Sequence, residues 1–93
     1  VSAEEAYRIG LANHLCEPEE LESKTMEIAQ TIASKSMSTM RVAKKTIRAA
    51  LDNGITDGVE IEAIAFASLL DTEDKEIGVQ AFLNRSDPEW KHR

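Results

Sequence analysis

One stretch of this chain, from Gly58 to Leu70, constrains the fold more than any other. Its apolar residues recur at nearly every helical angle: Val59, Ile61, Ala63, Ile64, Ala65, Phe66, Ala67, Leu69 and Leu70. A helix that is apolar nearly all the way round needs burial on more than one side. A chain of 93 residues buries only about 60 to 65% of its unfolded surface. We therefore expect a partner surface to cover part of this helix.

Two further helices are predicted in the first third of the chain. Ser2 and Glu5 have the spacing of a capping box, in which the hydroxyl and the carboxylate each satisfy a free backbone N–H. Gly10 supplies a left-handed stop, so the first helix should run from Ala3 to Ile9. The second helix is expected at 18–33, where a proline and several glutamates suit its first turn. The connector between them should be extended, or a brief strand.

The remaining segments are also helical in pattern. Ser36 is placed to cap a third helix that ends before Gly54, and its apolar stripe contains Met40, Ala43, Ile47 and Leu51. Thr72 is placed to cap a last helix that stops before Pro88, with acidic residues in its first turn: Glu73, Asp74 and Glu76. Strict alternation of apolar and polar residues is absent. The sequence therefore predicts an all-α fold, a small helical bundle.

Charge and cysteine content narrow the classes of function. Eleven Lys and Arg against seventeen Asp and Glu give a net charge of −6, which disfavours nonspecific nucleic-acid binding because that binding neutralises phosphates. Cys16 is the only cysteine, which excludes an internal disulfide and a site built from several cysteines and fits a reducing compartment. His14 and His92 lie far apart and read as ordinary loop or tail residues, so no metal site is expected. No apolar run is long enough to cross a bilayer, and the chain begins at Val1. We expect a soluble, excised or processed piece, in the cytoplasm or in a mitochondrial matrix.

Short patterns, in order along the chain, carry a resemblance to a known family. The best match is to T-x-D-x-x-E-G-x-x-A-F, with Thr72, Glu73, Asp74, Gly78, Ala81 and Phe82. Resemblance to A-x-E-A and G-L-V-N comes from Ala3, Glu5, Ala6, Gly10, Leu11, Ala12 and Asn13. Resemblance to I-A-x-x-S-P with a downstream Lys comes from Ile32, Ala33, Ser36 and Lys44. The ending A-F-x-x-K-R-x-P-x-F/W is similar to Ala81, Phe82, Leu83, Pro88 and Trp90. The chain thus resembles the C-terminal helical segment of the enoyl-CoA hydratase/isomerase (crotonase) family.

This chain departs from the family pattern at several positions. Met37 stands where the family usually has proline, and Ile77 replaces the usual glutamate before the glycine. The tail pair usually written Lys-Arg is Arg85 and Ser86, and Leu70 stands where an aromatic is often found. The last two departures bear on ligand binding.

The resemblance implies a division of labour between two parts of an enzyme. Residues 1–93 would be a single C-terminal helical domain, and a separate N-terminal β-β-α spiral would hold the thioester, the oxyanion donors and the acid–base residues. This chain would then contribute no catalytic residue and would be inactive alone. Its helices would pack over the spiral and build a homo-oligomer, a trimer or a dimer of trimers. The parent enzyme would hydrate or isomerise an acyl-CoA through a stabilised enolate.

The same resemblance places two residues at the nucleotide end of coenzyme A. Arg85 would pair with a phosphate, and Leu70 would give an apolar contact to the adenine without ring stacking. No cofactor is implied beyond the coenzyme A thioester, which is the substrate of the parent enzyme.

Other functions fit some of the residues. A stand-alone helical interaction module without catalysis has the same composition, because an apolar helix that needs a partner looks alike in both cases. The third predicted helix carries a basic face that suits phosphate, an acidic partner or nucleic acid, or that is simply solvated: Arg41, Lys44, Lys45 and Arg48. A small acyl carrier would need an exposed serine at a helix start, whereas Ser68 lies inside the apolar helix.

Overall fold

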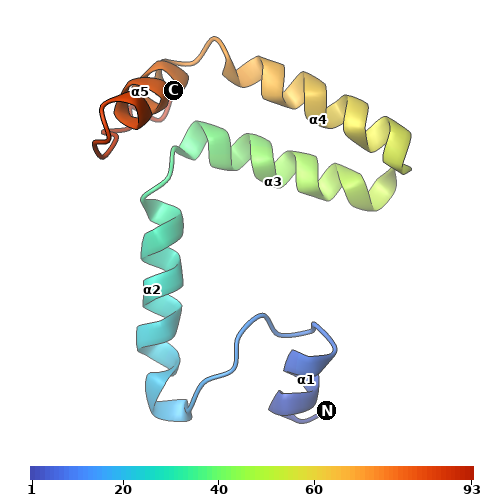
Figure 1. Ribbon diagram of the computed structural model, residues 1–93. Helices are drawn as coiled ribbons and strands as arrows, with labels where there is room; N and C mark the ends of the chain where they lie inside the picture. The colour runs from blue at the N-terminus through green and yellow to red at the C-terminus, as the bar shows by residue number, and fades with distance from the viewer. The chain divides into compact units, whose positions relative to one another are not determined.

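The computed structural model describes all 93 residues, and all of its regular structure is helical (Figure 1). The elements are α1 (Ala3–Arg8), a 3-10 turn η1 (Pro18–Glu20), α2 (Leu21–Ala33), α3 (Met37–Asp52), α4 (Ile55–Leu69) and α5 (Glu73–Leu83). The prediction of an all-α fold is confirmed. The chain forms two compact units, residues 1–32 and residues 33–93.

The first unit opens with a capped helix that matches the prediction in part. The Ser2 hydroxyl accepts a hydrogen bond from the Glu5 N–H at 3.1 Å, and Gly10 has the expected positive φ of 78°. The Glu5 carboxylate, however, is paired with Arg8 at 2.6 Å. The predicted return bond from this carboxylate to the helix start is therefore wrong, because an oppositely charged neighbour on the same face binds it instead.

The second predicted helix begins as a tighter turn. Residues 18–20 form η1, and the α-helix proper starts at Leu21. The connector before it is irregular and contains no strand. The apolar residues of α2, among them Leu21, Ile28 and Ile32, are exposed.

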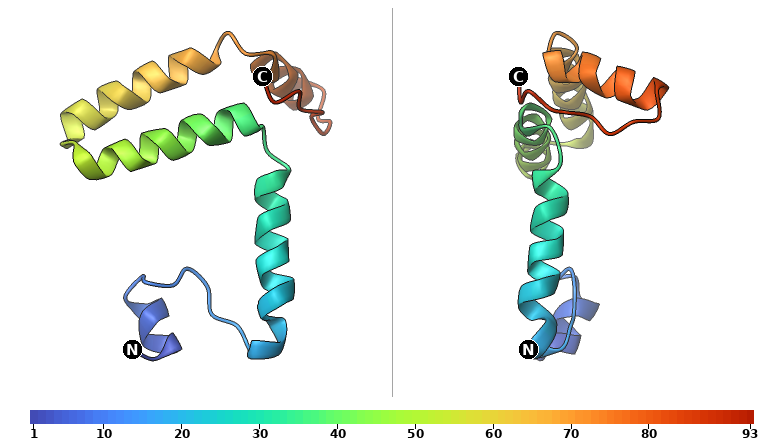
Figure 2. Two further views of the ribbon diagram at one scale, coloured as in Figure 1. Left: turned by 180° about the vertical axis from the view of Figure 1, so that it is seen from behind. Right: turned by 90° about the vertical axis from the view of Figure 1, so that its left-hand side faces the viewer.

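The second unit is built on a helical hairpin. Helices α3 and α4 run antiparallel and side by side, joined by the short link at Asn53 and Gly54 (Figures 1 and 2). Ser36 caps α3 as predicted, accepting from the Thr39 N–H at 3.4 Å.

Helix α4 begins three residues earlier than the sequence pattern suggested. We expected the apolar helix to start at Gly58, but Gly54 is the N-cap and the Gly58 N–H donates to the Gly54 carbonyl at 2.8 Å. An interior glycine costs a helix about 1 kcal/mol relative to alanine, which packing against α3 offsets. None of the residues of α4 is buried. The second covering surface that this helix needs therefore stays a prediction.

Helix α5 and the residues after it complete the unit. Thr72 caps the helix by accepting from the Lys75 N–H at 3.2 Å, as predicted. The helix ends with Arg85 in a left-handed conformation, φ 51°, and the tail then runs back beside α5 (Figure 2). Ala81 is the only buried hydrophobic residue of the chain.

Candidate functional site

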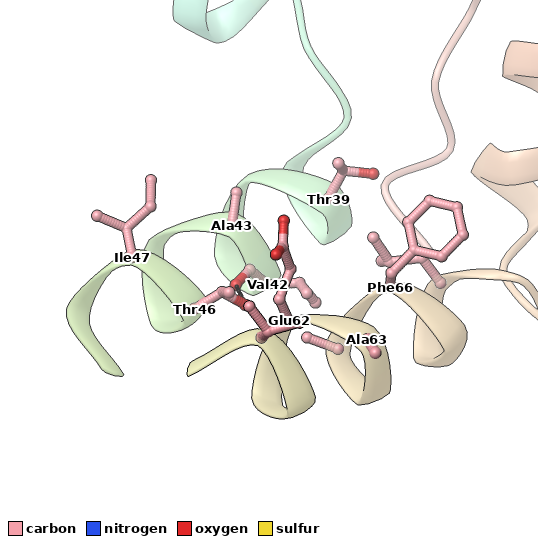
Figure 3. Close-up of a pocket in the computed structure, with 11 residues that line it drawn as sticks. Thr39, Val42, Ala43, Thr46, Ile47, Glu62, Ala63 and Phe66 are labelled. Carbon is pink, nitrogen blue, oxygen red and sulfur yellow. Dashed lines mark hydrogen bonds between the residues drawn. The ribbon is translucent and has the colours of Figure 1, made fainter. Parts of the chain in front are cut away.

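An open apolar groove of about 490 Å³ lies between α3 and α4 (Figure 3). Ala43 and Ile47 from α3 and Val59 and Phe66 from α4 line it, and Glu62 is its one charged residue. A single carboxylate offers no acid and base pair within the groove. The groove is therefore suited to apolar packing rather than to proton transfer.

The basic face of α3, which contains Arg41, Lys44, Lys45 and Arg48, points away from this groove. These four residues are all exposed, at spacings that share one side of the helix. The ion pairs of the chain involve other cations, namely Arg8, Lys24, Lys75 and Arg93. The structure is consistent with the interpretation of this face as solvated.

Arg85, the predicted phosphate contact, directly follows the C-cap of α5. Its backbone N–H donates to the Phe82 carbonyl at 3.2 Å, and the Ser86 N–H donates to the Ala81 carbonyl at 2.9 Å, which closes the helix end. The side chain is exposed and makes no ion pair within the chain. A guanidinium in this setting is free to bind an anion from outside.

Leu70, the predicted adenine contact, is the C-cap of α4 and is 49% exposed. It precedes α5, whereas Arg85 follows it. Helix α5 has 11 residues, a length of about 16 Å. The structure therefore places the two predicted site residues near opposite ends of one helix and does not gather them in a common pocket.

The most deeply buried side chain of the chain is a carboxylate, Asp74, which is 2% exposed. Its Oδ2 accepts hydrogen bonds from the hydroxyl of Ser36 and, at 3.3 Å, from that of Ser38. Its Oδ1 accepts from the backbone N–H groups of Lys91 at 2.7 Å and His92 at 3.1 Å. The carboxylate thus joins the starts of α3 and α5 to the tail.

The environment of Asp74 favours its charged form. Desolvation by burial raises the pKa of this carboxyl, but the hydrogen bonds from Ser36, Lys91, His92 and Ser38 outweigh it, and the pKa lies below its ordinary value. Asp74 is therefore ionised at neutral pH although no cation is paired with it.

The tail adds further contacts around this carboxylate. Trp90 Nε1 donates to the Ser34 carbonyl at 2.8 Å, and the Met37 N–H donates to His92 Nδ1 at 3.2 Å. The Asp74 N–H donates to the Arg93 carbonyl at 2.9 Å. We call Ser36, Ser38, Asp74 and the tail residues 90–93 the tail junction.

Sequence reasoning missed the tail junction. The pattern indicated that Asp74 was a first-turn partner of the helix dipole and that His92 was an ordinary tail residue. The signal that singled out Asp74 was its place in the Thr-x-Asp match to the family. Its partners lie 38 residues before it and 17 and 18 residues after it, which no local spacing rule connects.

The structure contains no candidate metal site and no candidate membrane span. No group of His, Cys, Asp and Glu side chains is arranged to hold a metal ion. No helix combines the length and apolar character that a membrane crossing requires.

Comparison with known proteins identifies the family. A family model described as "Enoyl-CoA hydratase/isomerase" matches residues 1–93. The chain belongs to the enoyl-CoA hydratase/isomerase family. It is 36% identical over 85 residues to crotonyl-CoA hydratase of Syntrophomonas wolfei, a match that covers 91% of this chain and 33% of that protein. It is 33% identical over 93 residues to a probable enoyl-CoA hydratase of Rhizobium meliloti, covering all of this chain and 36% of the relative.

Solved structures agree with this assignment. An enoyl-CoA hydratase from Bacillus anthracis matches all of this chain with a TM-score of 0.95 and 32% identity, over 36% of that chain. An enoyl-CoA hydratase from Geobacillus kaustophilus matches all of it with a TM-score of 0.92 and 30% identity, also over 36% of that chain. The chain thus spans about a third of the length of the relatives it matches.

Proposed function

We propose that this chain is the C-terminal oligomerisation and CoA-end segment of an enzyme that hydrates or isomerises acyl-CoA thioesters. The observation that carries the proposal is the family match over residues 1–93, together with coverage of about a third of each relative. In this proposal the remainder of the enzyme supplies the oxyanion donors and the acid–base residues, and this chain supplies none.

The exposed apolar surface supports a role in assembly. Ala81 is the only buried hydrophobic residue, while Phe66 is 65% exposed and Phe82 is 83% exposed. Soluble monomers rarely expose apolar surface on this scale, which is typical of a permanent interface. We infer that the catalytic domain covers part of this surface and that neighbouring subunits of a homo-oligomer, a trimer or a dimer of trimers, cover the rest.

The conformation of Arg85 supports a role at the CoA nucleotide. A side chain other than glycine in the left-handed region is strained, and such strain gathers at functional sites. Glycine would close the helix at lower cost. An exposed guanidinium at this place matches phosphate geometry, and Leu70 would give an apolar contact to the adenine.

The names of two relatives bear on the compartment. A mouse relative and a Dictyostelium discoideum relative are both named as mitochondrial. We propose the cytoplasm or the mitochondrial matrix, where acyl-CoA thioesters are the substrates and no further cofactor is needed.

A charge placed in the α3–α4 groove tests the assembly role. In the intact protein, Phe66→Glu should dissociate the oligomer in light scattering and lower the rate of crotonyl-CoA hydration, because an unpaired charge is costly in an apolar interface. Lys44→Glu, which places the same side chain outside the groove, should keep both. A Phe66→Glu protein that stays assembled and active would argue against the interface. A parent protein that assembles but has no activity on acyl-CoA would favour a stand-alone interaction module.

A further inference from the structure

Helix α5 is attached to the rest of its unit differently from the other helices. Helices α3 and α4 pack along one another, whereas α5 makes no comparable contact with either of them. What joins α5 to the start of α3 is the tail junction, through Asp74 and Trp90. The direction of α5 therefore depends on the tail junction, including the Trp90 ring beside Gly78, rather than on a broad apolar contact with α3 or α4.

The far end of the same helix bears Arg85. A rod about 16 Å long that tilts by about 10° at its first turn displaces its other end by about 3 Å. Hydrogen bonds tolerate only about 0.5 Å of variation in donor–acceptor distance. A small change at Asp74 is thus large enough to remove a contact made by Arg85.

The donors around Asp74 suit a directional role. Both carboxylate oxygens are engaged, one by hydroxyl groups of α3 and the other by backbone N–H groups of the tail. Two oxygens held from two sides fix the orientation of the first turn of α5 as well as its distance from α3. A single cation paired with Asp74 would fix the distance alone.

We propose that Asp74 is a positioning residue for the nucleotide end of coenzyme A, since it fixes the direction of α5 and so the place of Arg85. The inference rests on the proposed CoA-end role of this chain. Asp74 itself contacts no ligand, and it acts through the helix.

The test compares two substrates of the intact protein, crotonyl-CoA and crotonyl-pantetheine, which lacks the nucleotide. Asp74→Asn keeps the shape of the side chain but removes its charge and replaces one acceptor oxygen with an NH2 group, so that the backbone and hydroxyl donors lose a charged acceptor. We expect KM for crotonyl-CoA to rise about tenfold, with kcat and the KM for crotonyl-pantetheine unchanged. Arg85→Ala should have the same effect, and the double variant should be no worse than either single one, because the two residues then act on one contact.

Asp57→Asn is the matched control, since it removes an exposed carboxylate from the first turn of α4, away from the tail junction. Ser38→Ala is the milder variant, because it removes the 3.3 Å donor to Asp74 and the 2.8 Å hydrogen bond between the Ser38 and Ser36 hydroxyls but leaves the other three donors to Asp74 in place. It decides the question if Asp74→Asn fails to fold. We expect it to raise KM for crotonyl-CoA about twofold and to leave crotonyl-pantetheine unaffected. A merely structural role would instead lower stability and leave the ratio of the two KM values unchanged.

The outcomes separate the two proposals. If Arg85→Ala leaves that ratio unchanged, Arg85 does not contact the nucleotide, and the positioning role falls with it. If Arg85→Ala changes the ratio while the folded variants Asp74→Asn and Ser38→Ala do not, the CoA-end role stands and the positioning role is overturned.

Discussion

The indole of Trp90 lies directly over Gly78, so that a Cβ at Gly78 would be 3.2 Å from the ring. The ring is held in place, because its Nε1 donates to the Ser34 carbonyl at 2.8 Å. A glycine in the middle of α5 is thus explained by the close approach of the tail, and no left-handed backbone is involved.

Gly78→Ala should therefore destabilise the protein. The gain in helix propensity is about 1 kcal/mol, but the ring must shift or lose its bond to Ser34 to admit the methyl group. In a Trp90→Ala background the same change should stabilise by about 1 kcal/mol, as should Gly58→Ala, where nothing lies within 4 Å of the new Cβ. Urea unfolding of these variants measures each difference, and a stabilised Gly78→Ala protein with Trp90 intact would contradict the rigid contact.

The ionisation of Asp74 should make stability depend on pH. Because its folded pKa is lowered, the carboxylate contributes stability that is present above the ordinary carboxyl pKa and is lost as pH falls through the folded value. Urea midpoints measured from neutral to acid pH should decline less steeply in Asp74→Asn than in the parent protein. Equal slopes in Asp74→Asn and in the parent protein would count against the hydrogen bonds at Asp74.

Arg85→Gly should separate stability from function. Relief of a left-handed residue stabilises the helix end by about 1 kcal/mol, while loss of the guanidinium should raise KM for crotonyl-CoA. Arg85→Lys keeps a charge and the strained backbone, so it should keep the parent stability and part of the affinity. Thermal unfolding and steady-state kinetics provide the two readouts, and a glycine variant with unchanged KM would remove Arg85 from the site.

The 93-residue chain by itself should associate, because its apolar surface is exposed in both compact units. We expect at least a dimer at micromolar concentration in light scattering, with no hydration of crotonyl-CoA. A monodisperse monomer would show that this surface does not drive association.

Rules that relate residues close together in the sequence predicted most of the helices. Ser2, Ser36 and Thr72 were identified as caps from their place before apolar periodic segments, and each accepts the expected backbone hydrogen bond. These bonds join residues three apart, so the sequence alone contains all the information they require.

Two predictions about the helices were wrong for a similar reason. Gly58 looked like a helix boundary, but packing of α4 against α3 outweighs the cost of one interior glycine. Glu5 looked like the second half of a capping box, but Arg8 on the same face binds its carboxylate. In both places a neighbour in space decided between local alternatives of similar energy.

The sequence by itself determined the all-α class, the helix caps and the resemblance to the family, because each depends on residue type at short spacing or in a fixed order. Only the tertiary structure decided what Asp74 does. Its hydroxyl and backbone donors come from segments far away along the chain, brought together when the tail folds back beside α5. Backbone N–H groups are the same in every residue except proline, so the sequence does not show which of them a buried carboxylate will bind.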